Sequence, residues 1–216
     1  LAMFTTSTPI HRRGFVGSLA ALAGASILPG CAQLAPLPSV TDEDSAYQLA
    51  KEAFLYAYPM AYFARLRHAR MTQIDPVTQA RMRWNTFAHL NAAVTPATVG
   101  APQTDTFYSR LFHDVTAEPL IIRVPATHGR YWSLQLCDYF GYTFGMPNRR
   151  NTTGASVLAI VGPQWEGSLP AGVTHMHRST MNQGFSLLRM YFAGAADRSA
   201  ALAVQTGFEA MPLSVY

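Results

Sequence analysis

The stretch Arg130-Tyr131-Trp132-Ser133-Leu134-Gln135-Leu136-Cys137-Asp138 decides the fold class. Apolar side chains alternate in it with Tyr131, Ser133 and Gln135, and a period of two is typical of a strand that buries one face. Similar runs, separated by Gly and Pro turn signals, are predicted as strands at 107–115, 120–124, 156–161, 173–177 and 185–192. Several short strands at such spacing predict an antiparallel β-sandwich.

Helices flank these strands. Residues 41–44 have the composition of a helix N-terminus, and a helix with an alanine-rich stripe should follow, with Phe54 and Tyr58 as core aromatics. Pro59 should kink or break this helix, and a shorter helix should then run towards Arg70. A further helix is predicted over 195–210. The order indicates an α+β fold: N-terminal helices leading into an antiparallel β-sandwich-like domain, with a C-terminal helix.

Composition excludes several classes of protein. Hydrophobic residues make up 49% of the 216 residues and charged residues 13%, which excludes a mainly disordered chain. The net charge of +4 is small, and the basic residues are scattered along the chain. We therefore expect no nucleic-acid partner.

The first 30 residues resemble an export signal. Arg12 and Arg13 precede a short apolar run from Gly14 to Leu28, and this pattern resembles the twin-arginine export motif. The apolar run is too short to span a membrane. Cys31 ends a lipobox-like Leu28-Pro29-Gly30-Cys31, so it is predicted to carry the lipid anchor; the alternative is an ordinary cleaved signal. Residues 31–41 would be a tether and residues 42–216 the folded domain, on the periplasmic side of a bacterial membrane.

Polar residues near the predicted strands are the candidates for chemistry. Asp105, His89 and Ser109 are the residues that a hydrolase-like site would use, although Asp105 also suits a structural Asx turn. Candidate ligand-binding residues are Asn85, Tyr108, Arg130, Gln135 and Asp138. His175-x-His177 has metal-pair spacing but no evident third ligand, so neither a metal nor another cofactor is predicted. The motifs of common hydrolases and nucleotide-binding proteins are absent from the sequence.

Motifs spread over residues 45 to 216 resemble one family. They are Phe54-Leu55-Tyr56-Ala57-Tyr58-Pro59-Met60, Trp84-Asn85-Thr86-Phe87-Ala88-His89, Thr104-Asp105-Thr106-Phe107-Tyr108-Ser109, Gly129-Arg130-Tyr131, Gln135-Leu136-Cys137-Asp138 and Val161-Gly162-Pro163-Gln164-Trp165. Their order and spacing are similar to those of the DUF1254 domain proteins, whose activity is not established. The resemblance implies helices before a β-rich domain, and a second, C-terminal DUF1214 domain beyond Met211-Pro212-Leu213-Ser214.

Two functions remain open from the sequence. One is an exported cell-envelope lipoprotein that binds a small ligand or an envelope component. The alternative is a hydrolase-like enzyme with a polar site around Asp105 and His89. The resemblance to a two-domain family further suggests an uncovered apolar face near 185–192 and the C-terminal helix, and with it possible homo-oligomers.

Replacing Cys31 tests the anchor. If Cys31 is acylated, Cys31→Ala should move the mature protein from the membrane fraction to the soluble fraction, because the acyl chains supply the affinity for the bilayer. Fractionation with immunodetection measures this. Mass spectrometry that finds an unmodified residue N-terminal to Cys31 in the mature protein would contradict the prediction.

Overall fold

The computed structural model describes residues 42–92, 103–152 and 154–216. The chain divides into two units, residues 1–47 and 48–216, and of the first unit only residues 42–47 are described. The predicted signal, the tether and Cys31 lie outside the described residues. Within the described part, no helix combines the length and the hydropathy that a membrane crossing needs.

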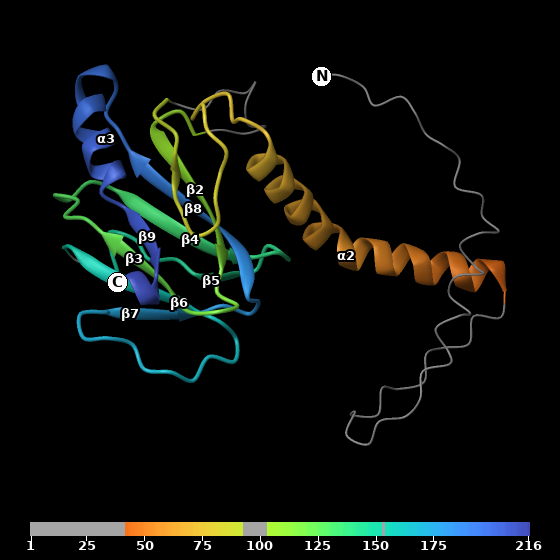
Figure 1. Cartoon of the computed structure of the whole chain (residues 1–216). Helices are drawn as coiled ribbons and strands as arrows, with labels where there is room; N and C mark the ends of the chain where they lie inside the picture. The colour runs from red at the N-terminus through yellow and green to blue at the C-terminus, as the bar shows by residue number, and fades with distance from the viewer. Residues whose placement is uncertain (1–41, 93–102, 153) are drawn as a thin grey trace. The chain divides into compact units, whose positions relative to one another are not determined.

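Helix α2 (Glu43–Thr72) begins as its sequence predicts. The Asp42 carboxylate accepts hydrogen bonds from the backbone N–H of Ser45 at 2.7 Å and from its hydroxyl at 2.9 Å, as an N-cap does. Of the kink or break predicted at Pro59, the break does not occur, because α2 is one helix with Pro59 inside it. The ribbon bends midway along its length (Figure 1), which is how a helix accommodates the missing N–H of a proline.

Two sheets form a sandwich, as the strand pattern predicts (Figure 1). In the described residues the first sheet has the order β1 (Ala88–His89), β2 (Thr106–Asp114), β8 (Gln183–Tyr191), β4 (Trp132–Asp138) and β5 (Thr143–Gly145). The second has the order β7 (His175–Arg178), β6 (Ser156–Val161), β3 (Leu120–Val124) and β9 (Glu209–Pro212). Neighbouring strands are antiparallel except β6 and β7.

The main core lies between the two sheets. Its fully buried side chains come from alternate positions of the strands and include Leu111, Leu120, Ile122, Trp132, Leu134, Leu158, Ile160, Leu188 and Met190. Phe208, which follows the C-terminal helix, packs edge-on against Trp132 with ring centroids 5.3 Å apart. Burial of this apolar surface is the main stabilising contribution to the sandwich.

The C-terminal helix is present but shorter than predicted. The short 3₁₀ helix η2 (Ala195–Asp197) comes first, and helix α3 (Arg198–Thr206) follows it. The helix therefore ends at Thr206, whereas the prediction extended it to residue 210. Residues from Glu209 instead form β9, which pairs with β3, and the turn η3 (Leu213–Val215) follows. A four-residue strand has no periodic signal of its own, so the pairing with β3 decides its structure.

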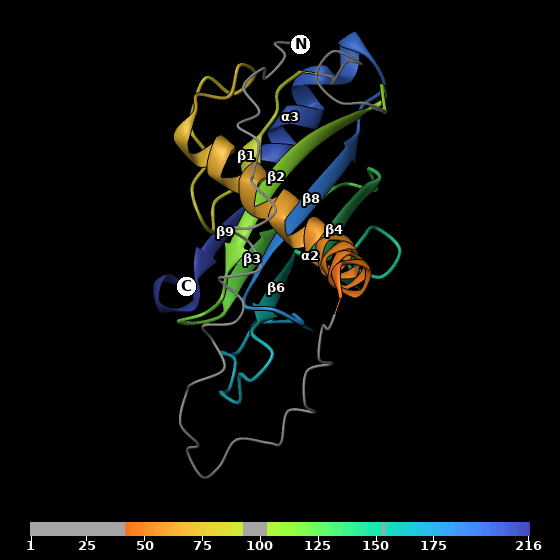
Figure 2. The same cartoon turned by 90° about the vertical axis from the view of Figure 1, so that its right-hand side faces the viewer.

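The two halves of α2 have different surroundings. Its second half packs on the outer face of the first sheet and crosses β2 and β8 (Figure 2). Phe63 stacks on Tyr139 at 6.1 Å and lies 5.8 Å from Phe185. In the first half, Tyr56 lies 5.3 Å from the ring of Phe140, between centroids. The prediction of Phe54 and Tyr58 as core aromatics is wrong, because they are 63% and 54% exposed.

Most apolar side chains of the face predicted near the end of the chain are covered, although Tyr191 is 40% exposed. Strand β8 lies in the middle of its sheet, between β2 and β4, and its inward side chains are buried. Phe208 is 1% exposed. Exposed aromatic side chains gather on α2 instead, because that helix extends beyond the sheet that its second half covers.

One place in the first sheet admits only glycine. Gly184 of β8 lies between His113 and the end of β4, and a Cβ built on it would lie 2.3 Å from the carbonyl oxygen of Cys137 and 2.5 Å from Nε2 of His113. His113 is fully buried, with Nδ1 3.2 Å from the Ser186 hydroxyl, and Nε2 has no hydrogen-bond partner among the described residues. The absent side chain therefore makes room for the imidazole.

We predict that Gly184→Ala lowers the free energy of unfolding by about 3 kcal/mol, because the methyl group overlaps backbone and ring atoms. Gly129→Ala is the matched control, since Gly129 has a φ of 77° but open space around its Cβ position. Strain alone should cost it about 1 kcal/mol. Equal losses in urea unfolding of the two variants would contradict the close approach.

His113 should make stability depend on pH. Burial lowers its pKa from 6.5 to about 4, against the opposing charges of Asp114 and Asp138. Because the unfolded chain takes up this proton first, stability is complete above pH 6.5 and falls as the pH decreases towards 4, by up to about 1.4 kcal/mol per pH unit. Urea unfolding at pH 7 and pH 5 should show a smaller decrease for His113→Gln than for wild type. His128→Gln, which changes an exposed histidine, should behave as wild type.

Candidate functional site

The structure joins two of the three predicted hydrolase residues. His89 Nδ1 lies 2.8 Å from the Ser109 hydroxyl. Ser109 is fully buried, however, and its oxygen also accepts an N–H from Gln205 of α3 at 2.9 Å. Burial lowers the pKa of His89, and a hydrogen bond to the backbone of Phe208 partly offsets this. The pair therefore fastens β1 to β2 and to the segment around α3, and a substrate has no access to the serine.

Asp105 lies apart from this pair. It is exposed, and its backbone carbonyl accepts the N–H of Phe192 at 3.0 Å. No hydrogen bond joins its carboxylate to another residue in the described part of the chain. The three residues do not form a triad, and the Asx turn is not formed either.

Three of the predicted ligand-binding residues have structural partners. Asn85, at a φ of 56°, exchanges two hydrogen bonds with the backbone of Asp114, at 2.8 and 2.9 Å. Asp138 accepts the backbone N–H groups of Phe140 and Tyr142 and the hydroxyl of Thr180.

Arg130, the third of these residues, donates two hydrogen bonds to Asp197, one of them at 2.7 Å. The bonds to Arg130 and the backbone N–H of Ala193 lower the pKa of Asp197 to about 2. Together with Asn85 and Asp138, this pair stabilises the ends of strands and the turns between them.

The two remaining candidates, Tyr108 and Gln135, meet at a third residue. Arg189 of β8 lies between them, with its guanidinium carbon 5.7 Å from the centroid of the Tyr108 ring. Its Nη1 donates to the Gln135 side-chain oxygen at 3.2 Å. Gln135 in turn donates to the Thr143 hydroxyl at 3.0 Å. We call Tyr108, Gln135 and Arg189 the arginine cluster.

Strand register places this cluster on the outer face of the first sheet. Arg189 is opposite Tyr108 on β2 and opposite Ser133 on β4. Two residues further along β8, at the end of the strand, Tyr191 is 40% exposed. Tyr131, whose carbonyl accepts the N–H of Tyr191, is 47% exposed. Two aromatic rings that are open to solvent therefore border a half-buried arginine.

The charge of Arg189 is not balanced within the described residues. None of them brings a carboxylate oxygen within 4.0 Å of it. The stretch 93–102, which precedes β2, contains no Asp or Glu. A half-buried guanidinium that lies over a tyrosine ring and has a fixed amide partner is suited to an anionic group.

A second positive group lies nearby on the same face. Arg110 pairs with Leu187, so it is a diagonal neighbour of Arg189, roughly 7 Å away between Cβ atoms. Buried Asp75 accepts hydrogen bonds from Arg70 at 2.6 Å and from Arg110 at 3.0 Å, so this trio carries one net positive charge.

Several groups hold Asp75 in its ionised form. Burial alone raises the pKa of Asp75, but the backbone N–H groups of Val77 and Thr78 and the two arginines hold it below its ordinary value. Asp75 therefore remains bound to its own arginines, and the face of the sheet keeps an excess of positive charge.

Other groups in the described part of the chain do not form a metal or nucleophile site. His175 and His177 lie on β7 without a third ligand, and no group of three His, Cys, Asp or Glu side chains there would hold a metal ion. Burial lowers the pKa of His177, and His175 adds to this. Cys137 is free and buried in β4, as its strand position predicts.

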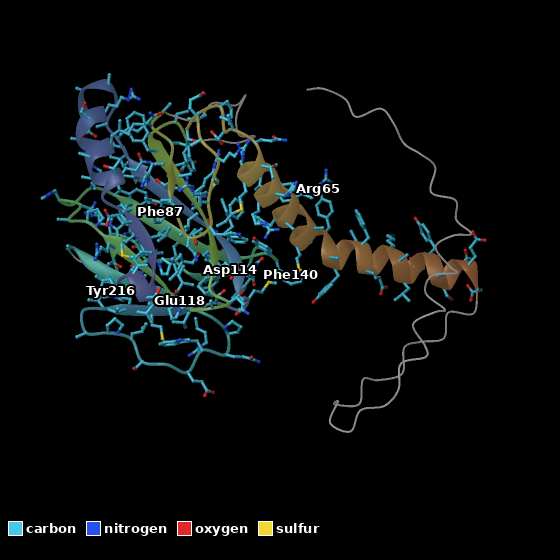
Figure 3. All side chains as sticks on the ribbon, in the orientation of Figure 1. Arg65, Phe87, Asp114, Glu118, Phe140 and Tyr216 are labelled. Atoms are coloured by element: carbon cyan, nitrogen blue, oxygen red, sulfur yellow. The ribbon has the colours of Figure 1, made fainter. Side chains whose placement is uncertain are left out.

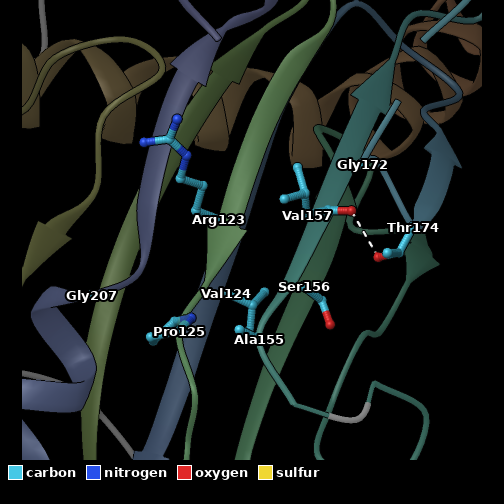
Figure 4. Close-up of a pocket in the computed structure, with 9 residues that line it drawn as sticks. All are labelled: Arg123, Val124, Pro125, Ala155, Ser156, Val157, Gly172, Thr174 and Gly207. Atoms are coloured by element: carbon cyan, nitrogen blue, oxygen red, sulfur yellow. Dashed lines mark hydrogen bonds between the residues drawn. The ribbon is translucent and has the colours of Figure 1, made fainter. Parts of the chain in front are cut away.

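A hollow of about 360 Å³ opens over the second sheet (Figure 4). Its polar side chains are engaged: Thr174 donates to the carbonyl of Val157 at 3.0 Å. Arg123 pairs with Glu209 at 3.4 Å and lies over the ring of Tyr216. The hollow therefore offers a ligand less uncompensated charge than the arginine cluster does.

Sequence reasoning missed Arg189 itself. It lies in the predicted strand 185–192, where it is a charged residue within a largely apolar run. That contrast is a signal, but the strand pattern alone does not say which residues of other strands surround it.

Comparison with known proteins shows the family. No curated protein matches the chain. The VPA0106 protein from Vibrio parahaemolyticus is 25% identical with a TM-score of 0.61, over 77% of this chain and 38% of that one. An uncharacterised protein from Burkholderia cenocepacia is 14% identical with a TM-score of 0.41, over 62% of this chain and 37% of that one. The chain thus spans less than two fifths of either structure.

The match to the family model covers more than half of this chain. A model described as a protein of unknown function (DUF1254) matches residues 84–212, which include every strand from β1 to β9. The chain belongs to the DUF1254 family.

Proposed function

We propose that this DUF1254 protein binds a small anionic ligand at the arginine cluster on the outer face of its first sheet. One observation carries the proposal: Arg189 is half-buried, is oriented by Tyr108 and Gln135, and has no carboxylate partner among the described residues. A carboxylate could take two N–H bonds from a guanidinium, and the rings of Tyr131 and Tyr191 would border an apolar or aromatic body.

Binding is favoured over hydrolysis by the burial of the nucleophile candidate. A reaction at Ser109 would need the hydroxyl to reach a substrate, but this side chain is fully buried and bonded to both His89 and Gln205. Asp105 makes no contact with His89 that would orient the imidazole. The hydrolase alternative therefore rests on residue types rather than on geometry.

We further propose that the protein acts in the cell envelope. The support is in the sequence: Arg12 and Arg13 before a short apolar run, and Cys31 at its end. An exported protein held at a membrane surface would meet ligands of the envelope. Small anions and the anionic groups of larger envelope molecules share the chemistry that Arg189 would recognise.

Benzoate and benzamide test the anion site, because they have the same ring and differ in charge. Benzoate at tens of millimolar should raise the thermal unfolding midpoint of the full chain, and benzamide should not. Arg189→Gln should abolish the benzoate effect, since it removes the charge and leaves a polar side chain. Arg189→Lys should retain part of it, because the charge stays but the planar fork is lost.

Arg150→Gln is the matched control, since it removes the same charge from an exposed loop position. It should leave the benzoate response unchanged. Equal responses to benzoate and benzamide, or a full response in Arg189→Gln, would overturn the proposal. Turnover of ester substrates that is lost in Asp105→Asn would favour the enzyme instead.

A further inference from the structure

Residues 54–62, in the middle of α2, expose a continuous apolar stripe. Phe54, Tyr58 and Tyr62 follow one another at intervals of four residues, so they lie on one side of the helix. Their rings contact in sequence, with centroids 5.5 Å apart between Phe54 and Tyr58 and 6.4 Å apart between Tyr58 and Tyr62. Figure 3 shows the side chains of this part of α2 away from the sheets.

The stripe is exposed at its outer end and joined to the core at its inner end. Phe54, Leu55, Tyr58 and Tyr62 are 63%, 62%, 54% and 52% exposed. Tyr62 then contacts Phe63, at 5.7 Å between centroids, and Phe63 stacks on buried Tyr139. A surface that continues the core in this way is held rigidly, which lowers the entropy lost when another surface covers it.

The exposed area is that of a weak or moderate protein interface. At roughly 200 Å² for each aromatic side chain, the stripe exposes about 450 Å², which is the size of the largest apolar patch on a typical monomer, a patch that is often functional. Two copies facing each other would bury about 900 Å² from these side chains alone. The neighbouring alanines and the stems of Lys51 and Arg65 would bring the total to the roughly 1,200 Å² at which specific interfaces begin.

Small residues lie beside the large ones on the same helix. Ala50, Ala53, Ala57 and Ala61 form a row next to the aromatic stripe, and all but Ala57 are exposed. In an antiparallel pair of helices, the aromatic row of one copy therefore meets the alanine row of the other. Such a surface is complementary to itself, as a two-fold interface requires, and antiparallel packing also pairs opposite helix ends.

We propose that α2 docks on α2 of a second copy of this chain through the stripe Phe54, Leu55, Tyr58 and Tyr62. A lipid surface is the less suitable occupant, because helices that lie on membranes carry many Lys or Arg residues beside the apolar face. Between residues 48 and 62, α2 has only Lys51 and Glu52 as charged residues.

Sedimentation of the full chain over a range of concentrations tests the pairing. Wild type should form a dimer that dissociates on dilution, and Phe54→Ser/Tyr58→Ser should weaken dimerisation at least tenfold. Tyr142→Ser is the matched control, because Tyr142 is 61% exposed but lies between β4 and β5. It should dimerise as wild type does. Since the replaced side chains are exposed, circular dichroism should stay unchanged, and so should the unfolding midpoint at a dilution where both proteins are monomeric.

Other outcomes would overturn the proposal. One is a wild-type chain that stays monomeric over a 100-fold range of protein concentration with an upper limit of about 0.1 mM. This range covers weak protein association. Another is a double variant that dimerises as tightly as wild type. Vesicles of phosphatidylcholine and phosphatidylglycerol provide a second arm: a monomer that binds them only when Phe54 and Tyr58 are present would assign the stripe to lipid.

Discussion

Strand β8 is hydrogen-bonded along its length to β2 on one side and to β4 on the other. The core and the outer face of the first sheet both depend on this pairing. Because side chains of a strand alternate between faces, β8 contributes Leu188 and Met190 to the core and Arg189 to the outer face. A shift of one residue in either register would exchange these positions. The interior of the sandwich and the arginine cluster are therefore two results of one register.

The same pairing explains why polar groups are tolerated in the interior. His113, Ser186 and Gly184 lie on the inner face at one end of β2 and β8, where the missing side chain of Gly184 leaves space for an imidazole. Farther along β2, the Ser109 hydroxyl accepts an N–H from Gln205, and His89 is hydrogen-bonded to the backbone of Phe208. Buried polar groups that are bonded across elements fix how those elements meet, and a residue pair that resembles a catalytic dyad here has that role.

Helix α2 relates the two proposals to the fold. Its second half covers part of the outer face of the first sheet and ends near Asp75, whose ion pairs with Arg70 and Arg110 lie beside the arginine cluster. Its middle, with Tyr58 and Tyr62, continues the aromatic contacts of the core into solvent. Association of two copies through this stripe would place two of the proposed ligand-binding faces in one assembly without using any residue of the arginine cluster.

The sequence by itself determined the fold class, most strand positions, the start of α2 and the family, because these depend on periodicity, caps and turn residues that are close together in the chain. It did not determine β9, the continuity of α2 through Pro59, or the exposure of Phe54 and Tyr58, since each depends on what another element covers. The site shows the same division. Tyr108 and Gln135 were identifiable as polar residues of strands, whereas only the pairing of β8 with β2 and β4 brought Arg189 between them. Neighbours across a sheet are set by hydrogen bonds between segments far apart in the chain, and a local pattern does not contain that information.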